Sequence, residues 1–433
     1  MDTDAAVEKV YSEHASRILA ALVRLFGTHN LEFAEDVLQE AFRKALVAWH
    51  EAGIPDNPAG WIMAAAKNQA VDAIRGQRTQ RRFADDLAHH LESGWTLSHT
   101  VDREFDETRI KDHQLRMIFM CTGADLPPEN RIPLILRALC GFSIPAVCRA
   151  LFLPEATIKK RLLRTRERLQ GHAFEFPPPD RLPHAMDTVH TVIYLLFNEG
   201  FHSSDEAAPM RLELCREAVH LATQLVDEPR VFNQDTLGLL ALMQLHLART
   251  GARFDARNQN VPIDRQDRTR WDQEQIALAC RLIGLGATAP PGASGRFMIE
   301  ARIAERHCLA PTFAETDWKA IVGLYDQLVE ATGSPIAELH RAVAIGYAGD
   351  PRGALASVER LRANGILRAS HVAPAVLAHL AALLGDGEAA RRYAEESRRL
   401  GGTAREQQSI IDQVERLLTS SRRPEPPPQT HRS

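Results

Sequence analysis

The residues of this chain with the clearest chemical potential are two clusters of cations that could neutralise phosphates. Residues 155–170 carry six basic residues against two acidic ones, and residues 67–82 carry five against one. Lysine and arginine on a helix bind DNA through its phosphates and, in the major groove, through base edges. The whole chain has a formal net charge of -4. Affinity for nucleic acid must therefore come from these local clusters and not from a global field.

The cluster at 155–170 lies on the second helix of a predicted helix-turn-helix. Ser143 is a suitable N-cap for the first helix, residues 151–154 form the turn, and the second helix begins at Glu155 or Ala156. On this second helix we expect the apolar residues Ile158, Leu162 and Leu169, which have a helical spacing, to face the core. The opposite face carries Thr157, Lys160, Arg161, Arg164 and Arg168, flanked by Lys159 and Arg166. A merely solvated amphipathic helix is the alternative, but turn, period and charge together favour DNA binding.

Two further helices are predicted ahead of this motif. In the helix 35–49 the apolar face is formed by Leu38, Phe42, Ala45 and Trp49. In the helix 59–80 it is formed by Ile62, Ala66, Ala70 and Ile74. The polar side chains of the first helix either form a solvated surface or dock a partner helix. The second helix carries the other cationic cluster, although cations near a helix C-terminus are also common because of the helix dipole.

Composition indicates an all-α protein of several domains. The 433 residues are too many for one core, and the low aromatic content of 6% together with abundant Ala, Leu and Arg favours helices. No apolar run approaches the roughly 18 residues that span a bilayer, and the acidic N-terminus does not resemble a signal peptide. The six cysteines form no Cys-x-x-Cys pair. We therefore expect a cytoplasmic protein without membrane segments, metal or cofactor.

The helical periodicity divides the chain into six parts. We expect a first helical domain at 1–82, an acidic linker at 83–111 that could hold one short helix, a helix-turn-helix domain at 112–171 and a proline-rich linker at 172–185. A larger helical domain follows at 186–420, ahead of a disordered tail at 421–433. In this larger domain Asp350 and Gly385 each open a helix, about 34 positions apart, behind an apolar helix. This period is typical of tetratricopeptide-like (TPR-like) arrays.

Segments 34–42 and 57–75 resemble region 2 of bacterial sigma-70 factors of the extracytoplasmic-function type. The resemblance implies that the acidic helix binds the clamp helices of core RNA polymerase, through Asp36, Gln39, Glu40 and Arg43. It also implies that the next helix and the loop before it melt and hold the promoter −10 element. The residues implicated there are Asn57, Trp61, Lys67, Asn68, Asp72, Arg75, Arg78, Arg81 and Arg82. Where the family usually has Arg-Asn-Arg, residues 67–69 are Lys-Asn-Gln, which leaves one cation fewer.

Segment 141–168 resembles region 4 of the same family, which reads the promoter −35 element. The resemblance implies contacts by Thr157, Lys159, Lys160, Arg161, Arg164 and Arg168. One residue departs from the family pattern, because Phe152 stands in the turn where glycine is more usual. We expect its ring to pack inward and to shift the recognition helix.

Segments of the remainder, among them 189–201, 237–243 and 266–272, resemble a subgroup of these sigma factors that carries a long, helical, TPR-like extension. Its polar groups at 198–199, 264–268 and 317 lack any nucleophile elbow, phosphate loop or metal motif. We expect them to serve hydrogen bonding and capping rather than catalysis. Concave helical arrays bind peptides or other chain segments. A regulatory docking role is therefore expected for the extension, with a partner protein or with the chain's own region 2 or region 4.

These features lead to one main hypothesis and two alternatives. The main hypothesis is a sigma factor, not an enzyme, whose partners are core RNA polymerase and promoter DNA and whose extension regulates it. The first alternative is a helix-turn-helix regulator with a ligand- or protein-sensing domain that never engages polymerase. The second is a scaffold or enzyme whose basic helices are incidental, which would need a substrate pocket within 186–420.

Overall fold

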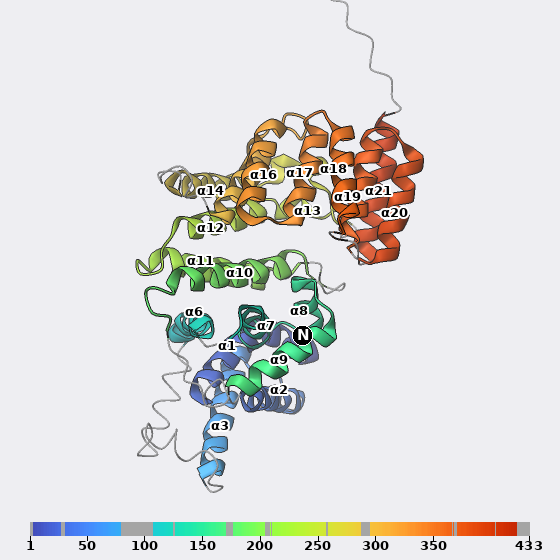
Figure 1. The fold of residues 1–433 in the computed structure, drawn as a ribbon. Helices are drawn as coiled ribbons and strands as arrows, with labels where there is room; N and C mark the ends of the chain where they lie inside the picture. Colours follow the sequence, from blue (N-terminus) through green and yellow to red (C-terminus); the bar gives the residue numbers. More distant parts are fainter. Residues whose placement is uncertain are drawn as a thin grey trace, which may run out of the picture. The chain divides into compact units, whose positions relative to one another are not determined.

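The computed structural model describes residues 3–26, 31–78, 107–123, 126–169, 176–203, 208, 210–256, 259–286, 295–365, 367, 370–402 and 404–421 (Figure 1). Every regular element in these ranges is a helix, and an isolated antiparallel bridge joins Phe254 to Asn260. The prediction of an all-α protein is confirmed. The chain forms two compact units, 1–232 and 233–433, and each is described by itself.

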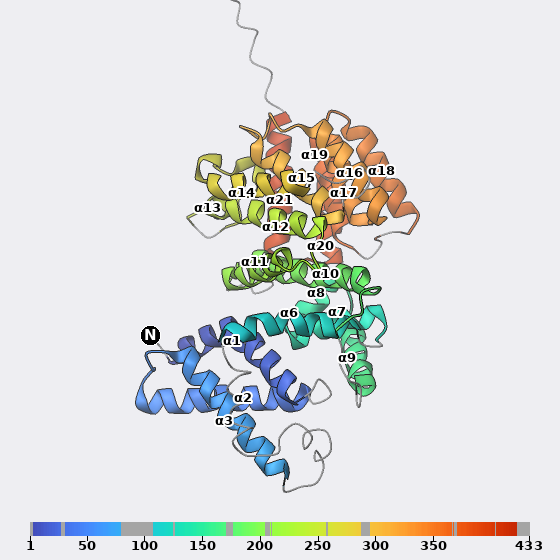
Figure 2. The same cartoon turned by 90° about the vertical axis from the view of Figure 1, so that its left-hand side faces the viewer.

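The first unit begins with three long helices, α1 (Thr3–Phe26), α2 (Leu31–Ala52) and α3 (Pro58–Arg78), drawn in blue in Figure 2. Helix α2 packs against both α1 and α3. Its predicted apolar face is buried as expected, with Leu38, Phe42, Ala45 and Trp49 all at most 6% exposed. Gly53 ends α2 with φ +86°, a conformation that glycine adopts without strain, and its N–H bonds to the Trp49 carbonyl at 3.0 Å.

Four helices follow in the same unit, namely α6 (Glu107–Gly123), α7 (Pro128–Ala138), α8 (Ile144–Leu151) and α9 (Glu155–Leu169). Helix α6 begins within the segment expected to be an acidic linker and contacts α1, α7 and α10. The buried amide of Gln114 donates to the Leu139 carbonyl at 3.0 Å and so ties α6 to the end of α7. Residues 79–106, the rest of that expected linker among them, lie outside the described part of the chain.

Helices α10 (Leu182–Phe201) and α11 (Leu212–Asp227) complete the first unit. The extension was predicted to begin after the prolines of 172–185, and the two compact units divide after Phe232, so that α10 and α11 belong to the first unit. The physical reason is the composition of α10, which buries apolar side chains against α6 and α7 as well as against α11. Gly200 allows the close approach of α11, because a Cβ there would lie 2.8 Å from the Arg211 carbonyl oxygen.

The second unit opens with α12 (Gln234–Ala248), which packs against α14 (Gln273–Gly286) and α15 (Arg296–Leu309). Short helices α13 (Thr250–Arg253), η2 (Ile263–Arg265) and η3 (Arg268–Arg270) lie between α12 and α14 in the chain. The backbones of α12 and α15 approach so closely at Gly238 that a Cβ there would lie 2.4 Å from the Met298 nitrogen. Only glycine fits this position without a shift of one helix.

The remaining helices pair as hairpins, as the predicted repeat requires. They are α16 (Trp318–Thr332), α17 (Pro335–Tyr347), α18 (Pro351–Ala363), α19 (Val372–Leu383), α20 (Gly387–Leu400) and α21 (Ala404–Ser421), drawn in orange to red in Figure 1. Each of α17, α18 and α20 begins at a side-chain cap, formed by Ser334, Asp350 and Asp386 respectively. The carboxylates of Asp350 and Asp386 accept backbone N–H groups at 2.8 and 3.0 Å.

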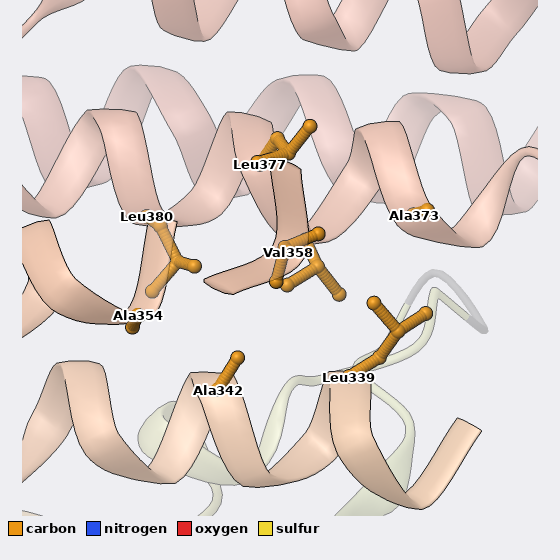
Figure 3. Packing of buried hydrophobic residues seen from close by; sticks show 8 residues of the cluster. Leu339, Ala342, Ala354, Val358, Ala373, Leu377 and Leu380 are labelled. Atoms are coloured by element: carbon orange, nitrogen blue, oxygen red, sulfur yellow. The ribbon is translucent and has the colours of Figure 1, made fainter. Parts of the chain in front are cut away.

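The core between these hairpins is aliphatic. Leu339 and Ala342 on α17 point toward Val358 on α18 and toward Leu377 and Leu380 on α19 (Figure 3), and all five are at most 2% exposed. Small side chains on the facing helices allow close packing. Among the described helices, none is long and apolar enough to cross a membrane.

Candidate nucleic-acid and polymerase-binding surfaces

The helix-turn-helix has the predicted local construction. Ser143 caps α8 by accepting the Ala146 N–H at 3.2 Å, and α9 begins at Glu155. Ile158 and Leu162 are buried, at 0% and 8% exposure, and so hold α9 against α7 and α8. The side chain of Leu169 lies outside the described residues. Thr165 was not among the residues predicted to face the core, but it is fully buried, and its hydroxyl donates to the Arg161 carbonyl at 2.7 Å. Its spacing of seven from Ile158 was the available signal.

The buried face of α9 leaves the predicted basic face toward solvent. Lys160, Arg164 and Arg168 are exposed, and Thr157 is half-buried beside them. Their spacing places all four on one side of the helix, separate from the face that carries Ile158, Leu162 and Thr165. A cationic helix face of this kind suits the major groove and its flanking phosphates.

Two residues of the same set have partners within the chain. The half-buried Arg161 donates through Nη1 to the Glu129 carbonyl at the start of α7, at 3.0 Å. Lys159 forms an ion pair with Glu155 one turn earlier, at 2.7 Å. The Glu155 carboxylate raises the pKa of Lys159 by its hydrogen bond and its charge. Arg161 therefore also holds α9 to α7, a role the sequence did not indicate.

The expectation for Phe152 was wrong. Its side chain is 76% exposed instead of packed inward. It is the C-cap residue of α8, with φ 52° and ψ 40°, in the left-handed region that glycine usually occupies. This backbone conformation directs the side chain away from the core, so the turn keeps the geometry of a glycine turn while carrying a ring.

The polar face of α2 is exposed where a partner helix could reach it. Asp36 and Gln39 are exposed, and Glu40 is half-buried. Arg43 binds both carboxylate oxygens of Glu40, each at 2.7 Å. This hydrogen bonding lowers the pKa of the Glu40 carboxyl from its ordinary value. This face therefore presents an exposed carboxylate at Asp36 and, one turn later, the ion pair of Glu40 and Arg43.

Identifiable contacts hold the loop before α3 and the first turn of that helix. The Asn57 side chain accepts the Gly60 N–H at 2.9 Å and so caps α3. A Cβ at residue 60 would lie 2.7 Å from the Asn57 amide nitrogen, which favours glycine there. Trp61 is half-buried, with its ring edge-on to the buried Trp49 at 5.7 Å. Both predicted −10 residues therefore also stabilise the junction of α2 and α3.

The rest of the predicted −10 set follows along α3. Asn68 and Asp72 are exposed on one face, Lys67 is half-buried, and Ile62, Ala66 and Ala70 fill the opposite face with 0% exposure. Arg75 and Arg78 belong to the helix, but their side chains, like that of Ile74, lie outside the described residues. Arg81 and Arg82 lie beyond the described end of α3.

The polar groups of the second unit have the structural roles expected of them. Asp267 and Asp317 cap η3 and α16 through backbone N–H groups at 3.0 Å. Arg268 donates to the carbonyls of His307 and Ala310, both at 2.6 Å, and so closes the end of α15.

Comparison with known proteins assigns these surfaces to a family. Residues 10–80 match sigma-70 region 2, and residues 117–169 match sigma-70 region 4. The chain belongs to the sigma-70 family, extracytoplasmic-function type. Two sigma-E factors of this type are similar to it. That of Haemophilus influenzae is 24% identical over 38% of this chain and 86% of its own length. That of Escherichia coli K12 is 29% identical over 31% of this chain and 71% of its own length.

The sigma factor also carries an extra C-terminal region. Residues 185–286 match a family of unknown function, DUF6596, and this match extends from α10 to α14. An uncharacterized protein of Rhizobium meliloti is 34% identical over 350 residues, which is 79% of this chain and 80% of that relative. No solved structure matches the sigma factor. Family membership implies binding to core RNA polymerase and promoter DNA, as a transcription initiation factor rather than an enzyme.

Proposed function

We propose that this sigma factor binds core RNA polymerase through the polar face of α2, opens a −10 element with α3 and reads a −35 element with α9. The observation that carries the proposal is the arrangement of α9. Its cations Lys160, Arg164 and Arg168 are exposed, while Ile158 and Thr165 on the other side are fully buried. The remaining contacts follow the family pattern on α2 and α3.

The proposed −10 and −35 contacts divide into two kinds. Lys160, Arg164 and Arg168 on α9, together with Lys67, Arg75, Arg78, Arg81 and Arg82, supply positive charge for phosphates and base edges. Asn57, Trp61, Asn68 and Asp72 line the part of the molecule where the strand is opened. Melting also requires an aromatic or apolar surface that receives an unstacked base. The partly exposed ring of Trp61 is the available aromatic surface.

We further propose that the extension regulates initiation. The helical hairpins from α16 to α21 belong to the second compact unit, which has its own core. Such arrays present a concave face to a partner, which here is another protein or a segment of the same chain.

Transcription of fragmented genomic DNA from the source organism, with purified core enzyme and sequencing of transcript 5′ ends, tests the proposal. We expect discrete start sites that share two upstream motifs. An Asp36→Arg/Glu40→Arg double variant should fail to retain core enzyme in a pull-down. A helix-turn-helix regulator that never engages polymerase would direct no initiation and would be unaffected by this double variant.

A chain ending at Phe232, where the first unit ends, tests the role of the extension. Higher output from this shorter chain than from the full chain would indicate that the extension inhibits, and lower output that it activates. Equal output and equal start sites would contradict regulation by the extension.

A further inference from the structure

The second unit contains a cavity that the sigma function does not use. It has a volume of about 370 Å³ and lies among α16, α17, α19 and α21, with residues 262–264 along one side. Much of its wall is aromatic, formed by Phe313, Trp318, Tyr325 and Tyr347. We call it the aromatic cavity. Its size falls at the lower end of small-molecule sites, which measure roughly 300–1,000 Å³.

The rings of the aromatic cavity hold one another in place. Trp318 and Tyr347 are stacked, with centroids 4.6 Å apart and planes at 20°. Phe313 meets both of them edge-on, at 5.2 and 5.1 Å. A set of rings that support one another loses little conformational freedom when a flat ligand packs against it. The wall is therefore organised before any ligand arrives.

Two imidazoles, each with a buried ring nitrogen, provide polar atoms at this wall. His307 and His379 both line the cavity, and His379 is 8% exposed. The Nδ1 of His307 and the Nε2 of His379 make no hydrogen bond to any residue that the structure describes. A buried polar atom without a partner costs about 1–3 kcal/mol, so such atoms usually meet a ligand or solvent partner. Burial lowers the pKa of both histidines to about 4, which leaves the imidazoles neutral near pH 7.

The charges at the cavity are already balanced. Asp264 is the one carboxylate that lines it among the described residues, and it is bound by Arg416 at 2.6 Å. Placing a charged ligand against this apolar wall would cost desolvation energy without a free counter-charge. The site therefore favours a neutral ligand.

We propose that the aromatic cavity binds a neutral, planar aromatic small molecule that carries a hydrogen-bonding edge. A peptide would bring an N–H and a carbonyl with every residue, whereas the uncharged polar groups of the lining are the imidazoles, Gln413 and the polar ends of Trp318, Tyr325 and Tyr347. A flat molecule needs one or two such partners and gains from stacking on the rings. This inference stands whether or not α9 reads a −35 element, because it concerns the second unit alone.

The test uses N-phenyl-1-naphthylamine, a neutral fluorescent probe with two aromatic ring systems and one N–H. Titrated into the full-length protein, the probe should show saturable fluorescence enhancement with one site per chain. Binding should also raise the midpoint of thermal unfolding, because a ligand stabilises the state that it binds.

Two variants connect that binding to the cavity. Ala375 lines the cavity and is half-buried, so Ala375→Trp should fill it and weaken probe binding on the order of tenfold or more. The matched control is Ala277→Trp on the exposed side of α14, outside the cavity, which should leave binding unchanged. His379→Phe keeps a ring but removes the nitrogen, and should weaken binding by about fivefold, the effect of one hydrogen bond.

Circular dichroism and urea unfolding establish that each variant is folded before it is titrated. Absence of saturable binding to the unsubstituted protein would overturn the proposal, and so would equal binding by the Ala375→Trp and Ala277→Trp variants. Displacement of the probe by a proline-rich peptide copying residues 176–183 would also overturn it, because the cavity would then be a peptide groove.

Discussion

Asp264 and Arg416 lie 152 positions apart in the sequence and form an ion pair at 2.6 Å. Their side chains are 19% and 25% exposed, whereas those of the neighbouring pair Arg391–Glu415 are 55% and 49% exposed. This less exposed pair joins the short helix η2 to α21, the last helix of the second unit. Removing one partner of such a pair leaves the other desolvated and alone.

We therefore expect Arg416→Ala to lower the free energy of unfolding of the second unit by about 1–3 kcal/mol. Arg391→Ala on α20, which removes the exposed pair with Glu415 of α21, should lower it by less than about 1 kcal/mol, because an exposed pair is screened by water and salt. Urea unfolding followed by circular dichroism measures both. Equal losses of stability in the two variants would show that the ion pair with Asp264 contributes no more than the exposed pair.

The two arginines of α9 should differ in what they contribute. Arg164 is exposed, so Arg164→Ala should weaken promoter binding by about 1–3 kcal/mol if it reads a base, with little effect on stability. Arg161 bonds to the Glu129 carbonyl, so Arg161→Ala should also lower the free energy of unfolding, by about 1 kcal/mol. Fluorescence anisotropy with a promoter duplex and urea unfolding separate the two effects. Unchanged promoter binding in both variants would contradict the −35 role of α9.

The exposed Phe152 predicts a substitution that stabilises the protein. Its left-handed backbone costs a non-glycine residue about 1 kcal/mol, and its ring buries little surface. Phe152→Gly should raise the free energy of unfolding by about 0.5–1 kcal/mol, while Phe152→Ala, which keeps the strain, should not. A loss of stability in Phe152→Gly would mean that the ring makes a packing contribution.

Replacing two helical glycines by alanine should change the free energy of unfolding in opposite directions. Gly238→Ala should destabilise by about 2–3 kcal/mol, because the new methyl group meets the α15 backbone at Met298. Gly284→Ala on α14 meets no atom within 4 Å and should stabilise by about 0.5 kcal/mol through helix propensity. Thermal unfolding of the pair of variants measures the difference, and a shift in the same direction for both would contradict the close approach of α12 and α15.

Three buried histidines should make stability depend on pH. Burial lowers the pKa of His190, His307 and His379 to about 4, from 6.5. Between these values the unfolded chain binds more protons than the folded one, so stability should fall as the pH decreases from 6.5 to 4. The loss is on the order of 1–3 kcal/mol per histidine. His379→Phe should show a smaller decrease between pH 6.5 and 5 in urea unfolding, and an unchanged decrease would exclude His379 as a contributor.

The sequence predicted best those features that depend on a single helix. The apolar spacing of Leu38, Phe42 and Trp49, and of Ile62 and Ala70, predicted burial because a helix side that repeats every 3.6 residues must face a neighbour. The cap at Ser143 was predictable for a similar reason, since it satisfies N–H groups within its own turn. The start of α9 at Glu155 followed from the turn before it.

Features that depend on distant residues were not predictable. The bond from Arg161 to Glu129 joins two helices, and nothing within either helix specifies it. The aromatic cavity draws its rings from the stretch that leads into α16, at Phe313 and Trp318, and from the end of α17, at Tyr347. For Phe152 the apolar residue type suggested burial. The positive φ of its backbone turns the side chain outward, and the usual sequence signal for a positive φ is a glycine, which this turn lacks. Similarly, the packing of α10 against α6, which includes α10 in the first compact unit, has no signal within either helix.

The caps at Ser334, Asp350 and Asp386 each accept an N–H from the helix that they begin. The start of each of these helices is thus fixed by residues of its own hairpin and does not depend on the neighbouring hairpins. A gene duplication that copies one hairpin would copy its boundaries as well, and the new hairpin could stack on the aliphatic side of the old one. The array can therefore lengthen or shorten by whole hairpins during evolution while the residues that match sigma-70 regions 2 and 4 remain unchanged.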